Sequence, residues 1–271
     1  MTSIKAKVVT VDTDVTGEHW TVGDIGELAR VIAIVAIGQA EHASMIVREL
    51  QPQRPALSIL QLFSQAKKQM NVAGKPDQVR YQRDAFLFEC ISWITAQQTA
   101  HPRKYLKVPH IKSTTQGMDG LMIELHATKP QVIRSTIFED KCTAEPRDKF
   151  RDEVLVTFGE HHRHERSADL LSTAISLIKE SGLDGSAATK AAGPVMDLAY
   201  RTYRAALTVD AKINSPDKRS KLFKDYTDLD GITQKQRVGA TFVLDESLRD
   251  WFQKLADQVV HALTQFENDH V

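Results

Sequence analysis

Cysteine is scarce in this chain, and long apolar runs are lacking. Cys90 and Cys142 are the only cysteines among 271 residues, which argues against a disulfide framework and favours a reducing compartment. The most apolar stretch, residues 31–38, falls well short of the roughly 18 residues that a membrane span requires. The opening residues MTSIKAKVVTVD lack the apolar core of a signal peptide. We therefore expect a cytoplasmic protein with no membrane partner.

A net charge is also lacking, since 35 lysines and arginines balance 35 aspartates and glutamates. This balance removes the overall basicity of many nucleic-acid-binding proteins, although a local basic stripe would be sufficient for binding. The chain has no glycine-rich phosphate loop, so we do not expect it to hydrolyse ATP itself. It also has no recognisable helix-turn-helix or zinc finger, so sequence-specific reading of bases is not expected.

The hydrophobic pattern predicts a mixed α/β (α+β) fold, in which a small mixed sheet is flanked by helices, with extra helices at both ends of the chain. The expected strands cover residues 4–11 and 238–245, besides two strands within 117–143. The expected helices cover residues 22–50, 57–70, 78–98, 167–181, 195–208 and 246–266, and a further helix begins at Pro146. Composition predicts loops over residues 71–77, 183–194 and 210–236. We expect a helical N-terminal region, residues 1–75, and a second region, residues 76–271, that carries the site.

The most informative pattern is GMDGLMIELHATKPQVIRSTIFEDKCT, residues 117–143. Two apolar strands are joined there by a Lys-Pro turn. Asp119 stands where the first strand begins, whereas Glu139, Asp140 and Lys141 stand where the second strand ends. Because the strands of a hairpin run antiparallel, these residues meet at one end of a small sheet.

Two carboxylates and a lysine at one end of a sheet suit a divalent metal beside a phosphate. Magnesium, or manganese in its place, prefers oxygen ligands and keeps several waters, so one or two carboxylates are sufficient. We expect Asp119 and Glu139 to bind the metal through their carboxylates, and Asp140 through its carbonyl oxygen. Glu139 and Lys141 lie two residues apart on a strand and so face the same side. Lys141 would then orient or deprotonate the attacking water.

These residues resemble the active-site motif of the PD-(D/E)xK nuclease superfamily. The resemblance rests on Asp119 in GMDGL, on Glu139-Asp140-Lys141 after the apolar run VIRSTIF, and on the helix that precedes both. It implies a restriction-endonuclease-like core in the order helix, three strands, helix, strand, with Asp119 and Glu139 as metal ligands and Lys141 as the catalytic lysine. Many members add a glutamate from the preceding helix, and Glu89 is the candidate here. Methionine, not proline, precedes Asp119.

The resemblance implies metal-dependent hydrolysis of phosphodiester bonds in DNA. A small nuclease with no visible specificity module also resembles subunits of bacterial antiphage systems, where such a protein is paired with a helicase or ATPase. By general arrangement and size, the chain resembles the nuclease subunit of the Hachiman type. A restriction-type endonuclease is the competing enzyme. The non-enzyme alternative is an assembly protein on a nuclease scaffold, whose long helices at 22–50 and 246–266 would contact a partner.

A purely structural interpretation of the motif is also open. Asp119 and Gly120 could provide ordinary turn chemistry at a strand start, and Glu139 and Lys141 could face solvent at a strand edge. For Glu89, a solvated position on a helix is the alternative to a catalytic role.

A histidine-rich segment, GEHHRHER at residues 159–166, invites a zinc interpretation. His161 and His164 are three residues apart and could share a helix face, but no paired cysteine motif completes a zinc site. Contacts of His162, Arg163 and Arg166 with phosphate, or an exposed polar helix end, are the alternatives.

Two basic groups could track the backbone of a nucleic acid, or could simply be solvated. The first precedes the hairpin and consists of His101, Arg103, Lys104, Lys107, His110 and Lys112, with Tyr105 interleaved. The second lies in the polar, loop-like stretch over residues 210–236 and consists of Lys212, Lys218, Arg219, Lys221 and Lys224.

Overall fold

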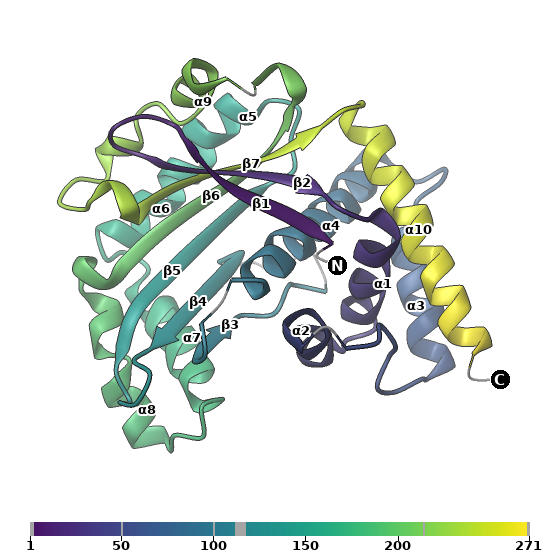
Figure 1. Ribbon diagram of the computed structural model, residues 1–271, viewed down its shortest axis with the longest axis horizontal. Coiled ribbons are helices and arrows are strands. Elements are labelled where there is room, and N and C mark those ends of the chain that lie inside the picture. The colour runs from purple at the N-terminus through teal and green to yellow at the C-terminus, as the bar shows by residue number, and fades with distance from the viewer. Residues whose placement is uncertain (1–2, 50, 100, 112–117, 214, 270–271) are drawn as a thin grey trace.

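A seven-stranded sheet runs through the molecule in the computed structural model, which describes residues 3–49, 51–99, 101–111, 118–213 and 215–269 (Figure 1). The strands follow one another across the sheet in the order β1 (Ile4–Thr10), β2 (Thr16–Val22), β7 (Arg237–Leu244), β6 (Arg201–Asp210), β5 (Val132–Lys141), β4 (Gly120–Leu125) and β3 (Lys104–Leu106). The four central strands, from β2 to β5, are parallel, and the outer strands pair antiparallel. The mixed α/β fold that the sequence predicts is confirmed.

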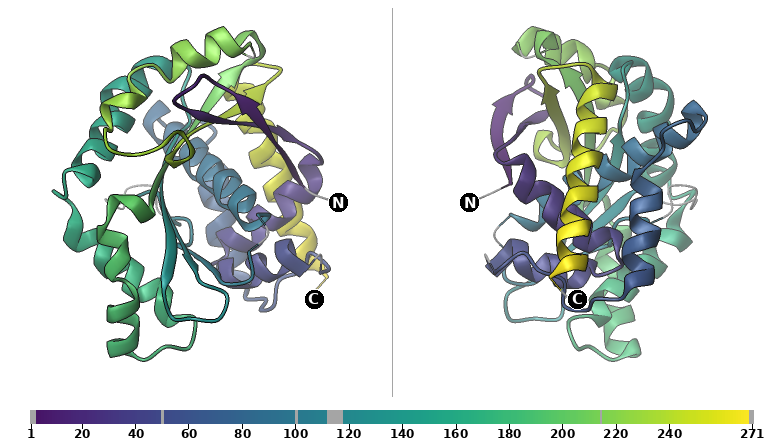
Figure 2. Two further views of the ribbon diagram at one scale, coloured as in Figure 1. Left: turned by 60° about the vertical axis from the view of Figure 1, so that its left-hand side comes forward. Right: turned by 90° about the vertical axis from the view of Figure 1, so that its right-hand side faces the viewer.

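Helices cover both faces of this sheet (Figure 2). The first face carries α1 (Ile25–Ala36), α2 (Ala40–Glu49), α3 (Leu60–Met70), α4 (Asp77–Gln97) and α10 (Leu248–Asn268). The second face carries α5 (Pro146–Lys149), a π-helical turn (Phe150–Val154), α6 (Leu155–His162), α7 (Ser167–Lys179) and α8 (Gly185–Ala191), with α9 (Pro216–Leu222) next to α5. Each layer buries its own apolar cluster against the sheet, and this burial is the main source of stability.

In the N-terminal region, described as helical for residues 1–75, the expected strand over 4–11 is confirmed as β1, and a second strand, β2, was not predicted. The β1–β2 hairpin joins the common sheet because β2 pairs with β7. The predicted helix over 22–50 is wrong in its limits, since α1 begins after the N-cap Asp24 and ends near Gly38, whose φ of +82° is left-handed. A second helix, α2, then follows. The boundary at residue 75 stays a prediction.

The predicted helix over 195–208 is wrong, because this segment contains the strand β6. Its residues from Arg201 to Val209 are all buried, since β6 is a central strand covered on both faces. Such a strand shows no alternation of polar and apolar residues, and its pattern is easily taken for a buried helix. The predicted loop over 183–194 contains α8, which Asp184 caps by accepting a hydrogen bond from the backbone N of Ala187 at 2.8 Å. The helices predicted at 78–98, 167–181 and 246–266 are confirmed as α4, α7 and α10.

Candidate functional site

The β4–β5 hairpin brings the two ends of the predicted motif together. Gly120 lies opposite Phe138 in the antiparallel register, so Asp119 comes beside the end of β5. The backbone N of Asp140 donates a hydrogen bond to Oδ2 of Asp119 at 2.9 Å. A Cβ atom on Gly120 would lie only 2.6 Å from Cδ2 of Phe138, so a larger residue there would disturb the pairing. Packing against Phe138 thus favours glycine beside the aspartate.

Lys141 connects Glu139 to a third carboxylate. Its Nζ lies 2.9 Å from Oε1 of Glu139 and 3.5 Å from Oε2 of Glu153. Glu153 belongs to the π-helical turn, a distortion of the helix that is frequent at functional sites. Glu153 was not predicted from the sequence; the only signal was its spacing of four residues from Lys149, with which it forms an ion pair.

Burial and, after it, the nearby charge of Asp119 raise the pKa of Glu139 to about 7, against the opposing effect of Lys141. Burial would lower the pKa of Lys141, but the charges of Glu139, Asp119 and Glu153 outweigh it and raise this pKa above its ordinary value. Lys141 is therefore a protonated cation at neutral pH. It is suited to hold an anionic oxygen or to orient a water, and not to accept a proton.

Glu89 lies near the motif but has a partner of its own. From α4 it accepts hydrogen bonds from the backbone N of His110 at 2.8 Å and from the His110 ring, whose Nδ1 is 3.1 Å away. Burial raises the pKa of Glu89, and the hydrogen bonds from His110 partly offset this effect. Glu89 shares the cavity of Asp119, yet its carboxylate also fixes the segment that carries His110.

The side chain of Asp140 turns away from Glu139 toward α4, as alternation along a strand requires. Its Oδ1 is buried without a hydrogen-bond partner among the described residues and lies 3.9 Å from NH2 of Arg204. Burial raises the pKa of Asp140 to about 8, although the charge of Arg204 lowers it. Only the backbone carbonyl of Asp140 therefore suits the metal role expected for this residue.

A cavity of about 610 Å³ lies at the carboxyl end of β5. Asp119 and Lys141 line it. Glu139, which is 5% exposed, does not line the cavity but forms an ion pair with Lys141. Ligands of sheets with parallel strands commonly bind at the carboxyl ends of the strands. The other lining residues come from α4, α10 and the segment around α5: Tyr81, Ala85, Glu89, His110, Asp140, Cys142, Thr143, Ala144, Glu145, Lys149, Glu153 and Arg249.

The donor set fits a hard divalent cation in part. In the described ranges, no group of three or more histidine, cysteine, aspartate or glutamate side chains lies close enough together to hold a metal ion. Asp119 and Glu139 nevertheless place two carboxylates side by side, and the burial that raises the pKa of Glu139 is a cost that a bound cation would relieve. Because magnesium keeps several waters, two carboxylates and the Asp140 carbonyl suit it better than zinc.

The histidine segment does not form the zinc arrangement that we considered. His161 is buried inside α6, and burial, aided by the charges of Arg166 and Arg201, lowers its pKa to about 4. His164 follows the end of α6 in a left-handed turn with φ of +64°, so the two histidines do not share a helix face. Arg163 pairs with Glu165 on the surface, in agreement with an exposed polar helix end.

The first basic group is largely used inside the fold. Lys104 is 3% exposed, and its Nζ donates to the backbone carbonyls of Ala96 and Gln97 at 2.7 and 3.0 Å, and also to Thr99, at the end of α4. Burial lowers the pKa of Lys104 to about 8. Lys104 is therefore a cap for a helix C-terminus, and its predicted contact with phosphate is wrong.

Other members of this group are also engaged by protein atoms. Arg103 donates to the carbonyls of His126 and Lys129 at 2.9 and 3.0 Å. Lys107 donates to the carbonyl of Met118, and its Nζ lies 2.6 Å from Nε2 of His110. His101 and Tyr105 are half-buried. Lys112 lies outside the described residues.

The second basic group divides between surface and interior. Lys212, Lys218, Lys221 and Lys224 are exposed on and around α9. Arg219 is instead buried and donates to the backbone carbonyl of Thr10 at 3.2 Å. Its predicted contact with a backbone phosphate is thus replaced by a contact with β1.

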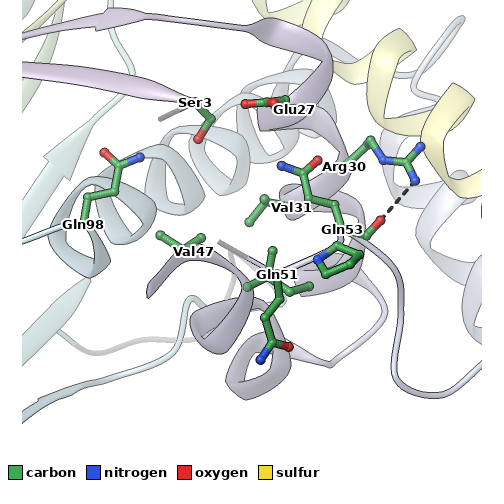
Figure 3. Close-up of a pocket in the computed structure, with 10 residues that line it drawn as sticks. Ser3, Glu27, Arg30, Val31, Val47, Gln51, Gln53 and Gln98 are labelled. Carbon is green, nitrogen blue, oxygen red and sulfur yellow. Dashed lines mark hydrogen bonds between the residues drawn. The ribbon is translucent and has the colours of Figure 1, made fainter. Parts of the chain in front are cut away.

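A second cavity, of about 410 Å³, lies between α1 and α2 (Figure 3). Figure 3 shows Glu27 and Arg30 of α1 on one side and Gln98, next to the end of α4, on the other, with a hydrogen bond from Arg30 to the carbonyl of Gln53 at 3.0 Å. One carboxylate oxygen of Glu27 is buried without a partner in the described part of the chain. Glu27 is the one carboxylate among the described lining residues, so this cavity does not repeat the paired arrangement at β5.

No protein-family model, curated protein or solved structure matches this chain. Within the described residues, no helix combines the length and the apolar character that a membrane crossing requires. The assignment of a function therefore depends on the geometry of the cavity at β5.

Proposed function

We propose that this protein is a magnesium-dependent or manganese-dependent nuclease that hydrolyses phosphodiester bonds of DNA. One observation carries the proposal: Asp119 and Glu139 come together at the ends of paired strands, and the protonated Lys141 lies 2.9 Å from Glu139 beside an open cavity. The element order also supports it. From α4 through β3, β4 and β5 to the helices from α5 to α8 and then β6, the chain follows the order of helix, three strands, helix and strand in PD-(D/E)xK nucleases.

In this proposal each side chain has a distinct role. Asp119 and Glu139 hold the divalent ion, which when bound supplies the Lewis acid that polarises the phosphate and activates water. Lys141, kept protonated by its neighbouring carboxylates, holds a phosphate oxygen and orients the attacking water. The hydrogen bond from the Asp140 backbone to Asp119 fixes one carboxylate before any ion binds, which reduces the cost of assembling the site.

Plasmid cleavage tests the proposal. Supercoiled and linear DNA are incubated with magnesium and either the wild-type protein or a Glu139→Ala, Lys141→Ala double variant, and we expect only the wild type to cleave. The matched control is a Lys67→Ala, Glu267→Ala double variant, which removes a lysine–glutamate ion pair between α3 and α10 whose residues do not line the cavity. Cleavage by the Glu139 and Lys141 variant at the wild-type rate would show that the activity does not depend on this site.

The chain is further proposed to act as the nuclease subunit of an antiphage complex, together with a helicase or ATPase partner. A partner would supply the ATP hydrolysis that we do not expect of this chain, because its sequence contains no glycine-rich phosphate loop. The same cleavage assay, run with and without the product of the neighbouring gene, tests this idea. Sequence-dependent fragments from the protein alone would favour a restriction-type endonuclease. Absence of cleavage of DNA and RNA in both settings would favour the non-catalytic assembly protein.

A further inference from the structure

The cavity at β5 is also lined by a cation outside the predicted motif. Arg249, the second residue of α10, lines the cavity together with Tyr81 of α4. The guanidinium carbon of Arg249 lies 4.1 Å from the centre of the Tyr81 ring, which is the geometry of a cation–π contact. This arginine was not selected from the sequence because α10 is far from the hairpin along the chain.

Arg249 is held in place by a carboxylate that has no access to solvent. Its NH1 donates to Oδ2 of Asp84, and Asp84 itself is fully buried. The other oxygen of Asp84 accepts hydrogen bonds from Nε and NH2 of Arg83, at 3.0 and 2.7 Å. A buried carboxylate with fixed partners leaves Arg249 little freedom to rotate. The guanidinium is thus oriented before any ligand arrives.

Part of this guanidinium stays available to a ligand. The Arg249 side chain is 32% exposed, and across the described ranges NH1 is the only one of its nitrogens that donates to a protein acceptor. The stability of α10 does not explain an arginine at this position, because a cation in the first turn opposes the helix dipole. Arginine presents a planar fork that matches two oxygens of a phosphate.

We propose that Arg249 forms a phosphate-binding subsite, which takes a backbone phosphate next to the one that reaches Asp119 and Lys141. This inference deepens the proposed nuclease function and rests on it. Tyr81 and Asp84 position the guanidinium, and the ligand is the phosphodiester backbone of a nucleic acid strand that crosses the cavity from α10 to β5. The subsite binds substrate without taking part in bond cleavage.

Binding without cleavage tests the subsite separately from the nuclease chemistry. A fluorescently labelled DNA oligonucleotide is titrated with full-length protein in EDTA, at several salt concentrations, and anisotropy is recorded. Loss of one phosphate contact lowers the salt slope by about 0.9, which weakens binding roughly eightfold at about 0.1 M salt. We expect this loss in Arg249→Gln, and a smaller loss in Arg249→Lys, which keeps the charge but not the fork.

Lys254→Gln is the matched control, because Lys254 is an exposed cation of the same helix and does not line the cavity. An unchanged slope and affinity in Arg249→Gln would overturn the subsite, and so would an equal loss in Lys254→Gln. If Arg249→Gln fails to fold, Arg249→Lys and Tyr81→Leu test the subsite in its place. Both variants should bind DNA more weakly than the wild type, and both should keep an unfolding midpoint near that of the wild type. Unchanged DNA cleavage by a folded Arg249→Gln protein with unchanged binding would remove the subsite and leave the nuclease proposal intact. If the wild type does not cleave DNA but binds it in a way that depends on Arg249, the nuclease proposal is contradicted and the phosphate-binding subsite is retained.

Discussion

The substitution Glu139→Gln should stabilise the metal-free protein at alkaline pH. Glutamine keeps the shape of the carboxyl group but cannot ionise. In the wild type, burial and the charge of Asp119 raise the pKa of Glu139 from 4.5 to about 7. Between these values the folded protein binds more protons at Glu139 than the unfolded chain, so wild-type stability falls as the pH rises. A change of this size corresponds to about 3 kcal/mol of unfolding free energy at about pH 8.

Urea unfolding in EDTA at about pH 5 and about pH 8 measures this effect. We expect the advantage of Glu139→Gln over the wild type to be small at the lower pH and to approach its full size at the higher pH. When magnesium replaces EDTA, the stability advantage of Glu139→Gln at the higher pH should become smaller, because a bound cation would stabilise the ionised Glu139 of the wild type. An advantage of the variant that does not change with pH would show that the pKa of Glu139 is not raised in the folded protein.

Glu153→Gln is a control for which the expected change in stability has the opposite sign. Glu153 pairs with Lys141, as Glu139 does. Burial alone would raise the pKa of Glu153, but its hydrogen bond from Lys149 and the charge of Lys141 lower this pKa overall. Glu153 therefore stabilises the fold above its ordinary pKa, and this contribution is lost as the pH falls. We expect Glu153→Gln to be less stable than the wild type at about pH 8, with a smaller difference in acid.

Three further substitutions separate structural from functional residues. Lys104→Met should lower the unfolding free energy by about 2 kcal/mol in urea, because it leaves carbonyls at the end of α4 without their donor, and it should not change the salt slope of DNA binding. Gly120→Ala should cost about 1–3 kcal/mol in the same assay, because its Cβ would meet the Phe138 ring; a stability equal to the wild type would show that the hairpin relaxes freely. Glu89→Gln should reduce the rate of plasmid cleavage by less than about tenfold, since the carboxylate mainly holds His110; complete loss of cleavage would make Glu89 a member of the catalytic set.

The hairpin could be predicted from the sequence because its information is local. The apolar strands, the Lys-Pro turn and the Asp119-Gly120 pair lie within one short segment, and antiparallel pairing then determines which residues meet. The long helices α4 and α10 were predicted for a similar reason, since each carries its apolar residues along one continuous segment.

The rest of the site could not be predicted because it depends on contacts distant in sequence. Arg249 and Glu153 enter the cavity from α10 and the π-helical turn, and neither stands in a recognisable motif. The strand β6 was missed because burial on both faces removes the alternation that marks a strand. Lys104 was misinterpreted because a basic residue before a hairpin gives no sign of whether its ammonium caps a helix or faces solvent.

A calorimetric titration of the protein with Mn²⁺ at neutral pH tests most directly whether Asp119 and Glu139 hold a divalent metal. We predict one site in the wild type, loss of that site in Glu139→Ala and in Asp119→Asn, and its retention in Glu267→Ala. Binding is also expected to release protons, because the pKa of Glu139 is raised to about 7 and the metal takes the ionised carboxylate. Equal binding of Mn²⁺ by the wild type, Glu139→Ala and Asp119→Asn would contradict the claim that this pair of carboxylates holds a divalent metal.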